Sequence, residues 1–173
     1  MGDEALPVRA GRPGDAPEVV RLAGLMYRSI GAGPDGVGER AWEAWEEAAT
    51  TSLTDDPQRL AVYVVDHPAG EGLVAAGTGT IAGRLPNPWR PGDSRVGYVQ
   101  WMSTVPDFRR RGLGRAVLRA LLVWYEEEGV GVVELHATPD GAPLYGAEGF
   151  SDNQGGRAMR RRVWDLPTGP SGP

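Results

Sequence analysis

The sequence contains no cysteine. Disulfides, thiolate metal sites and covalent catalysis through a cysteine nucleophile are therefore excluded. Lysine is missing as well, because all 18 basic residues are arginines. Histidine is scarce: His67 and His136 are too few for a histidine-rich metal site. We therefore expect no metal centre and no thiol chemistry in this chain.

A long apolar run is also lacking. No stretch approaches the length that spans a bilayer, and the first residues, Met1 to Glu4, are acidic where a signal peptide would be basic. We expect a cytoplasmic protein with no membrane partner. The length of 173 residues suits one domain, which we place at residues 1–166, followed by a disordered Gly/Pro tail at 167–173.

The net charge of −5 argues against a general nucleic-acid binder. The charge is unevenly distributed, however. Residues 107–119 contain five arginines and one acidic residue, Asp107. A local basic patch on an acidic protein fits a small polyanion better than a long one.

The hydrophobic pattern predicts alternating strands and helices. Strands are expected at Leu6–Arg9, Leu60–Asp66, Leu73–Arg84, Val96–Val105, Val130–Ala137 and Arg157–Trp164. Helices are expected at about 15–29 and at Glu39–Leu53, Arg111–Glu128 and Ala142–Glu148. The glycines of Gly31–Gly38 predict a flexible connection, and the prolines of Leu85–Asp93 predict a loop.

The most informative segment is the turn from Pro106 to Arg115, between a predicted strand and a predicted helix. Gly112 and Gly114 let the backbone approach a ligand closely, and a helix start offers unpaired N–H groups at the positive end of the helix dipole. These features predict a phosphate-binding turn. The segment is neither a Walker A loop, which needs a lysine, nor a dinucleotide fingerprint, which needs a third glycine.

The pattern Arg109-x-x-Gly112-x-Gly114 resembles the acyl-CoA pyrophosphate loop of the GNAT N-acetyltransferase superfamily. Downstream, Leu144-Tyr145-x-x-x-Gly149-Phe150 resembles the second recurrent signature of that superfamily. The resemblance is detailed over about residues 94–151. It implies an α/β fold (α+β by some schemes) with a GNAT-like mixed, mostly antiparallel central sheet flanked by helices, in the order β-α-α-β-β-β-α-β-α-β. It also implies a sheet that splays between the two strands flanking the CoA helix.

The resemblance implies an N-acetyltransferase that uses acetyl-CoA as its co-substrate and a primary amine as its acceptor. Direct transfer in a ternary complex is consistent with the lack of cysteine. The pantetheine arm would follow the backbone of Met102, Ser103 and Thr104. The pyrophosphate would receive N–H groups from the turn residues Arg109, Arg110, Arg111, Gly112, Leu113, Gly114 and Arg115.

Two residues are candidates for proton transfer. Tyr145 matches the signature tyrosine that protonates the departing thiolate, and its alternative role is aromatic packing. A phenol with a pKa of about 10 stays protonated at neutral pH and suits a thiolate with a pKa of about 8.5. Glu134 and His136 share one face of a predicted strand, and His136 is a candidate base. A base acting through water remains an alternative, because Tyr98 and Gln100 stand where some members carry a catalytic glutamate.

The resemblance implies a small-molecule or peptide amine as the acceptor. The helix Glu39–Leu53 carries Trp42 and Trp45 among glutamates. It predicts either an acidic, aromatic mouth for a cationic amine or, as we prefer, an amphipathic helix with a core-facing tryptophan side. Two other functions stay open: a non-catalytic acyl-CoA-binding or regulatory domain on the same fold, and an RNA or phosphoprotein contact through the three arginines. A homodimer is also left open.

Overall fold

The computed structural model describes residues 6–55, 60–86, 88 and 91–152. The chain divides after Leu135 into two compact units, residues 1–135 and 136–173, which are described separately. Within the described residues, the helices are too short or too polar to cross a membrane. The predicted strand at Arg157–Trp164 and the tail at 167–173 lie outside the described residues, and the single domain at 1–166 stays a prediction.

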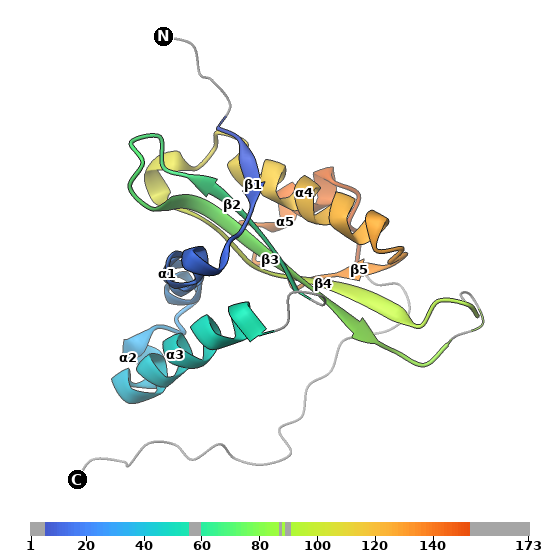
Figure 1. The fold of residues 1–173 in the computed structure, drawn as a ribbon, viewed down its shortest axis with the longest axis horizontal. Coiled ribbons are helices and arrows are strands. Elements are labelled where there is room, and N and C mark those ends of the chain that lie inside the picture. Colours follow the sequence, from blue (N-terminus) through green and yellow to red (C-terminus); the bar gives the residue numbers. More distant parts are fainter. Residues whose placement is uncertain (1–5, 56–59, 87, 89–90, 153–173) are drawn as a thin grey trace. The chain divides into compact units, whose positions relative to one another are not determined.

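The first unit is built on a five-stranded sheet with its strands in the order of the sequence (Figure 1). The strands are β1 (Val8–Ala10), β2 (Leu60–Asp66), β3 (Leu73–Gly83), β4 (Arg95–Thr104) and β5 (Val133–Glu134). All neighbours pair antiparallel except β4 and β5, which pair parallel. The predicted mixed, mostly antiparallel sheet flanked by helices is therefore confirmed.

Helices cover both faces of this sheet. Helix α1 (Ala16–Ser29) packs on β3 and β4 and contacts α3 (Glu39–Asp55), which follows the short α2 (Pro34–Val37). Helix α4 (Leu113–Glu127) packs on the opposite face, over β2, β3 and β4, as Figure 1 shows. Because both faces are covered, the first part of β3, from Leu73 to Gly79, is buried at every residue.

Small residues in β3 and β4 let α4 approach closely. A Cβ on Gly77 would lie 2.8 Å from Cγ1 of Val117 and would also overlap the sulfur of Met102. The buried face of α4 is formed by Leu113, Val117, Leu118, Leu121 and Tyr125. Their spacing of three and four residues is that of one helix face, which explains why the sequence predicted this helix.

Several predicted boundaries shift by one or two residues, such as the start of β1 at Val8, and three predictions need correction for a structural reason. Gly31–Gly38 is not only a flexible connection, because Pro34 begins the helical turn α2. The helix predicted from Arg111 begins at Leu113, after Gly112 takes a left-handed conformation. The strand predicted at Val130–Ala137 is reduced to Val133–Glu134, where β4 offers a partner.

The described part of the second unit contains one helix, α5 (Ala142–Ala147), close to the predicted Ala142–Glu148. The segment before it turns at Thr138, whose carbonyl accepts hydrogen bonds from the amides of Gly141 and Ala142. After it, the amide of Phe150 returns to the carbonyl of Tyr145 at 3.0 Å. The signature residues Tyr145 and Phe150 therefore belong to one local fold.

Candidate functional site

Strand β4 has one edge that is only partly used. It pairs with β5 at two positions, Gly97 with Val133 and Tyr98 with Glu134. From Val99 to Thr104 no described strand pairs with this edge, although the other edge stays bonded to β3. An unpaired strand edge presents backbone N–H and C=O groups to any extended ligand. We call residues Val99–Thr104 the open half of β4.

A β-bulge interrupts the open half. Gln100 pairs with Thr78 and Ser103 with Ala76, so Trp101 and Met102 together stand opposite Gly77. Trp101 has φ of 55°, a left-handed value that is unusual for a bulky residue. Such bulges redirect side chains and occur often beside functional sites. The predicted pantetheine residues Met102, Ser103 and Thr104 follow this bulge, and each is half-buried.

The strand continues into the predicted phosphate turn. A short 3₁₀ helix, η2 (Pro106–Phe108), leads to Arg110 and Gly112, with φ of 63° and 79°. The first intrahelical bond runs from the amide of Ala116 to the carbonyl of Gly112 at 3.0 Å. The N–H groups of Leu113 and Gly114 therefore stand at the start of the helix, before its first intrahelical bond. Left-handed residues before a helix start form concave sets of amides suited to anions.

The backbone conformation at position 112 requires a glycine. A Cβ at this position would meet no described heavy atom within 4 Å, so space alone does not require glycine. The φ of 79° requires glycine, because residues with a side chain rarely adopt this value. The same open space is what a phosphate group needs to reach the amides.

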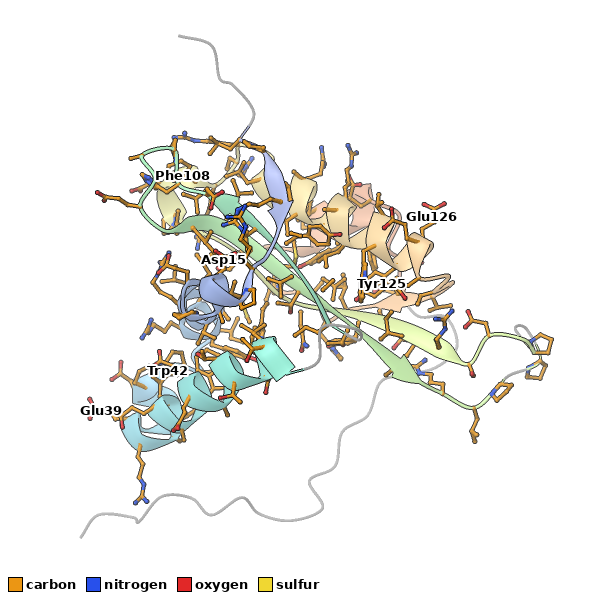
Figure 2. All side chains as sticks on the ribbon, in the orientation of Figure 1. Asp15, Glu39, Trp42, Phe108, Tyr125 and Glu126 are labelled. Carbon is orange, nitrogen blue, oxygen red and sulfur yellow. The ribbon has the colours of Figure 1, made fainter. Side chains whose placement is uncertain are left out.

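The three arginines of the turn differ in their contacts. Arg109 donates from Nε to the carbonyl of Thr104 at 3.1 Å, so it ties the turn to the end of β4. Arg111 lies over the ring of Phe108 at 4.8 Å. Phe108 in turn meets the ring of His67 edge-on at 5.2 Å, which packs the β2–β3 loop against the turn. Figure 2 shows Phe108 at this turn. Arg110 is exposed.

Tyr145 lies on α5 in the second unit. Its ring packs edge-on against Phe150 at 5.9 Å and covers Gly141, where a Cβ would lie 3.0 Å from Cε2 of Tyr145. Burial raises the pKa of the Tyr145 hydroxyl above its ordinary value. The hydroxyl therefore stays protonated at neutral pH, as an acid requires.

His136 does not lie where the sequence predicted. β5 ends at Glu134, so Glu134 and His136 do not share a strand face, and the prediction that they do is wrong. His136 is exposed and lies two residues beyond the strand. Glu134 forms an ion pair with Arg84 at 2.6 Å and is committed to that contact. Within the described part of the chain, no cluster of three potential ligands could hold a metal ion.

On the α1 and α3 side of the sheet lies a cavity of about 430 Å³ that the sequence did not predict. Helix α3 contributes Trp45, Ala48, Ala49, Ser52 and Leu53 to its wall. The strands contribute Leu60, Thr78, Thr80, Ile81, Gln100 and Trp101. We call this the α3 cavity. In the sequence, only the spacing of Trp42 and Trp45 indicates an aromatic surface on this helix. The cavity itself forms because folding brings α3 beside β4.

Two of the residues that line this cavity, Trp45 and Trp101, belong to an aromatic cluster. Trp45 meets Trp42 at 4.7 Å, Tyr27 at 5.2 Å and Trp101 at 6.1 Å between ring centroids. Trp101 donates from Nε1 to the hydroxyl of Tyr27 at 3.2 Å. Trp42 is buried and donates to Glu46 at 2.8 Å. We prefer the prediction that the tryptophan side of this helix faces the core. Trp42 agrees with it, because it is buried, whereas Trp45 lines the cavity.

Comparison with known proteins places these features in context. A family model described as the acetyltransferase (GNAT) family matches residues 35–150. No curated protein sequence matches the chain.

Solved structures show the same fold at low sequence identity. A GCN5-related N-acetyltransferase from Ralstonia eutropha is 24% identical with a TM-score of 0.76, covering 91% of this chain and 98% of that one. A predicted acetyltransferase with acetyl-CoA from Clostridium acetobutylicum is 18% identical with a TM-score of 0.69, covering 90% and 96%. A glucosamine-6-phosphate N-acetyltransferase from Arabidopsis thaliana is 15% identical with a TM-score of 0.68, covering 92% and 99%.

Proposed function

Because the chain belongs to the GNAT family of acetyltransferases, whose co-substrate is acetyl-CoA, we propose that it transfers an acetyl group to a primary amine. The open half of β4, which leads directly into a left-handed turn at the start of helix α4, is the observation that carries this proposal. Both parts lie in the region that the family model matches. The similar protein from Arabidopsis thaliana is named for an amine-bearing sugar, which supports an amine acceptor here.

The residues of the open half fit an extended thioester-bearing arm. Met102, Ser103 and Thr104 would hold it through backbone groups, because their strand edge has no described partner. The N–H groups from Arg110 to Arg115 would bind the pyrophosphate, with the helix dipole adding to their field. Arg109 positions this turn by its bond to Thr104, and Arg111 supplies charge from its place over Phe108. Acetyl-CoA brings the activated acetyl group and a thiol leaving group.

The transfer needs a proton for the thiolate, and Tyr145 is our candidate for the acid. Its pKa is raised by burial, so its proton is available throughout the neutral range. The base that takes the amine proton is proposed as His136 or a water relay. Glu134 is not a candidate, because Arg84 holds both of its oxygens, at 2.9 Å and 2.6 Å. Since the chain has no cysteine, the acetyl group passes to the amine without an acyl-cysteine intermediate.

A thiol-release assay tests this function directly. The protein has no thiol of its own, so a thiol reagent reports only the CoA that is set free. A panel of primary amines should include at least one that releases thiol in proportion to enzyme. Acetyl-CoA should also raise the melting temperature, because it binds the native state alone. Thermal stabilisation without thiol release from any amine would favour the non-catalytic acyl-CoA-binding domain, and no stabilisation would contradict both functions.

A further inference from the structure

The α3 cavity meets the open half of β4 at two residues. Gln100 and Trp101 line the cavity and also belong to the strand segment whose second edge has no described partner. In a regular strand, the consecutive side chains of Gln100 and Trp101 would point to opposite faces of the sheet. The bulge at Trp101 breaks this alternation, and both residues line the cavity. The cavity and the open edge of β4 therefore share two neighbouring residues.

The chemistry of the cavity wall is largely apolar. Tryptophan, alanine, leucine and isoleucine side chains make up most of it, and no carboxylate is among the lining residues in the described chain. Glu46, on the same helix, accepts the indole hydrogen of Trp42, and Glu43 and Glu47 are exposed to solvent. Among the described residues of this wall, a polycation would lose hydration without gaining a counter-charge.

The two tryptophans that line the cavity are held by their neighbours. Trp101 is tied to Tyr27 through Nε1, and Trp45 is packed between Trp42, Tyr27 and Trp101. Fixed rings of this kind present edges and faces to an aromatic ligand. The hydroxyl of Thr78 is already used, because it donates to the carbonyl of Gln100 at 3.0 Å. The volume of about 430 Å³ falls within the range of small-molecule sites.

We propose that the acceptor is a primary amine carried on an aromatic or similarly apolar body, that the α3 cavity holds this body, and that polycationic amines are poor acceptors. This inference rests on the proposed acetyl transfer and adds the substrate class to it. The amine at the end of the apolar body lies toward Gln100 and Trp101, the residues shared with the open half of β4.

The test compares two probes and two matched variants. The probes are 2-phenylethylamine, an aromatic monoamine, and spermidine, an aliphatic polyamine. Ala48→Leu adds three carbons to the cavity wall, and Ala44→Leu makes the same change one turn earlier on α3. Both alanines are exposed, but only Ala48 lines the cavity. Calorimetry on the CoA-loaded protein measures amine binding, and thiol release from acetyl-CoA measures transfer.

We expect 2-phenylethylamine to bind and to release thiol, with spermidine giving little of either. Ala48→Leu should weaken 2-phenylethylamine binding by about tenfold, as expected for overpacking a formed site, and Ala44→Leu should leave it unchanged. Acetyl-CoA affinity should be the same in both variants. Preference for spermidine, no binding of 2-phenylethylamine, or equal effects of the two variants would overturn the inference. Binding that Ala48→Leu weakens, but without thiol release, would contradict the proposed function while leaving the cavity as an aromatic-amine site.

Discussion

Tyr125 of α4 lies directly over Gly97 of β4: a Cβ built on Gly97 would be 2.5 Å from Cε1 of the tyrosine ring. Tyr125 is 1% exposed, and its hydroxyl donates to the carbonyl of Thr80 at 3.3 Å. Gly97 is also the residue at which β4 pairs with β5, just before its edge opens. The lack of a side chain at Gly97 therefore allows α4 to pack closely on β4, just before the open half begins at Val99.

The first prediction concerns this contact. Gly97→Ala should lower the free energy of unfolding by about 1–3 kcal/mol, because the buried ring has no room to move away. Urea denaturation followed by circular dichroism measures the effect. The matched control is Gly83→Ala on β3, where a Cβ meets no atom within 4 Å. If the two variants were equally stable, the close packing of Tyr125 on Gly97 would be wrong.

The second prediction concerns the turn. Gly112→Ala forces an L side chain into φ of 79°, which costs about 1–2 kcal/mol, and relief of that strain would turn the amides away from the phosphate position. We expect acetyl-CoA affinity to fall by about tenfold in calorimetric titration. Gly14→Ala is the control, because a Cβ there also meets no atom within 4 Å and φ is not left-handed. Unchanged affinity in Gly112→Ala would argue against a phosphate role for this turn.

The third prediction concerns Tyr145. Tyr145→Phe should lower kcat by about a hundredfold and leave acetyl-CoA affinity nearly unchanged, because a general acid acts in the transition state. Since burial raises the pKa of this hydroxyl, its ionisation should not reduce the wild-type rate until the pH exceeds about 10. Tyr125→Phe is the control: it removes a buried hydroxyl elsewhere and should affect stability but not turnover. Equal losses of rate and affinity in Tyr145→Phe would contradict the acid role.

The fourth prediction concerns acid stability. Arg9 joins β1 to the start of α1 and to β2, through ion pairs with Asp15 and Asp66, both at 2.7 Å. Hydrogen bonds from Arg9 hold the pKa of each carboxyl below its ordinary value. A lowered folded-state pKa stabilises the fold above the unfolded pKa of about 4, and this contribution is lost as the pH falls through the folded-state value.

Asp15→Asn should therefore cost about 1 kcal/mol of unfolding free energy at pH 7, and the difference from wild type should shrink as the pH falls below 4. Urea unfolding across this range measures it. Asp35→Asn, at an exposed position on α2, is the control and should leave the free energy of unfolding at pH 7 nearly unchanged. A difference for Asp15→Asn that persists unchanged in acid would exclude the ion pair as its cause.

Local patterns in the sequence determined much of this protein. The spacing of buried residues on α4 and the continuous apolar run from Leu60 to Val65 are local patterns, so these elements were predicted closely. Glycine at position 112 likewise follows from a conformation that the local turn imposes. The lack of cysteine excluded thiol chemistry without any structure.

Tertiary structure decided what depends on partners far along the chain. The strand expected at Val130–Ala137 lasts only while β4 lies beside it, so His136 falls outside the sheet. The left-handed conformation of Trp101 accompanies the bulge in its pairing with β3. No local sequence pattern around residue 101 predicts this bulge. The α3 cavity joins residues from positions 45 to 101, and its apolar wall exists only because folding places α3 over β3 and β4. The backbone conformation of the turn at Gly112 follows from the local sequence, whereas the α3 cavity is formed by surfaces that meet only in the folded state.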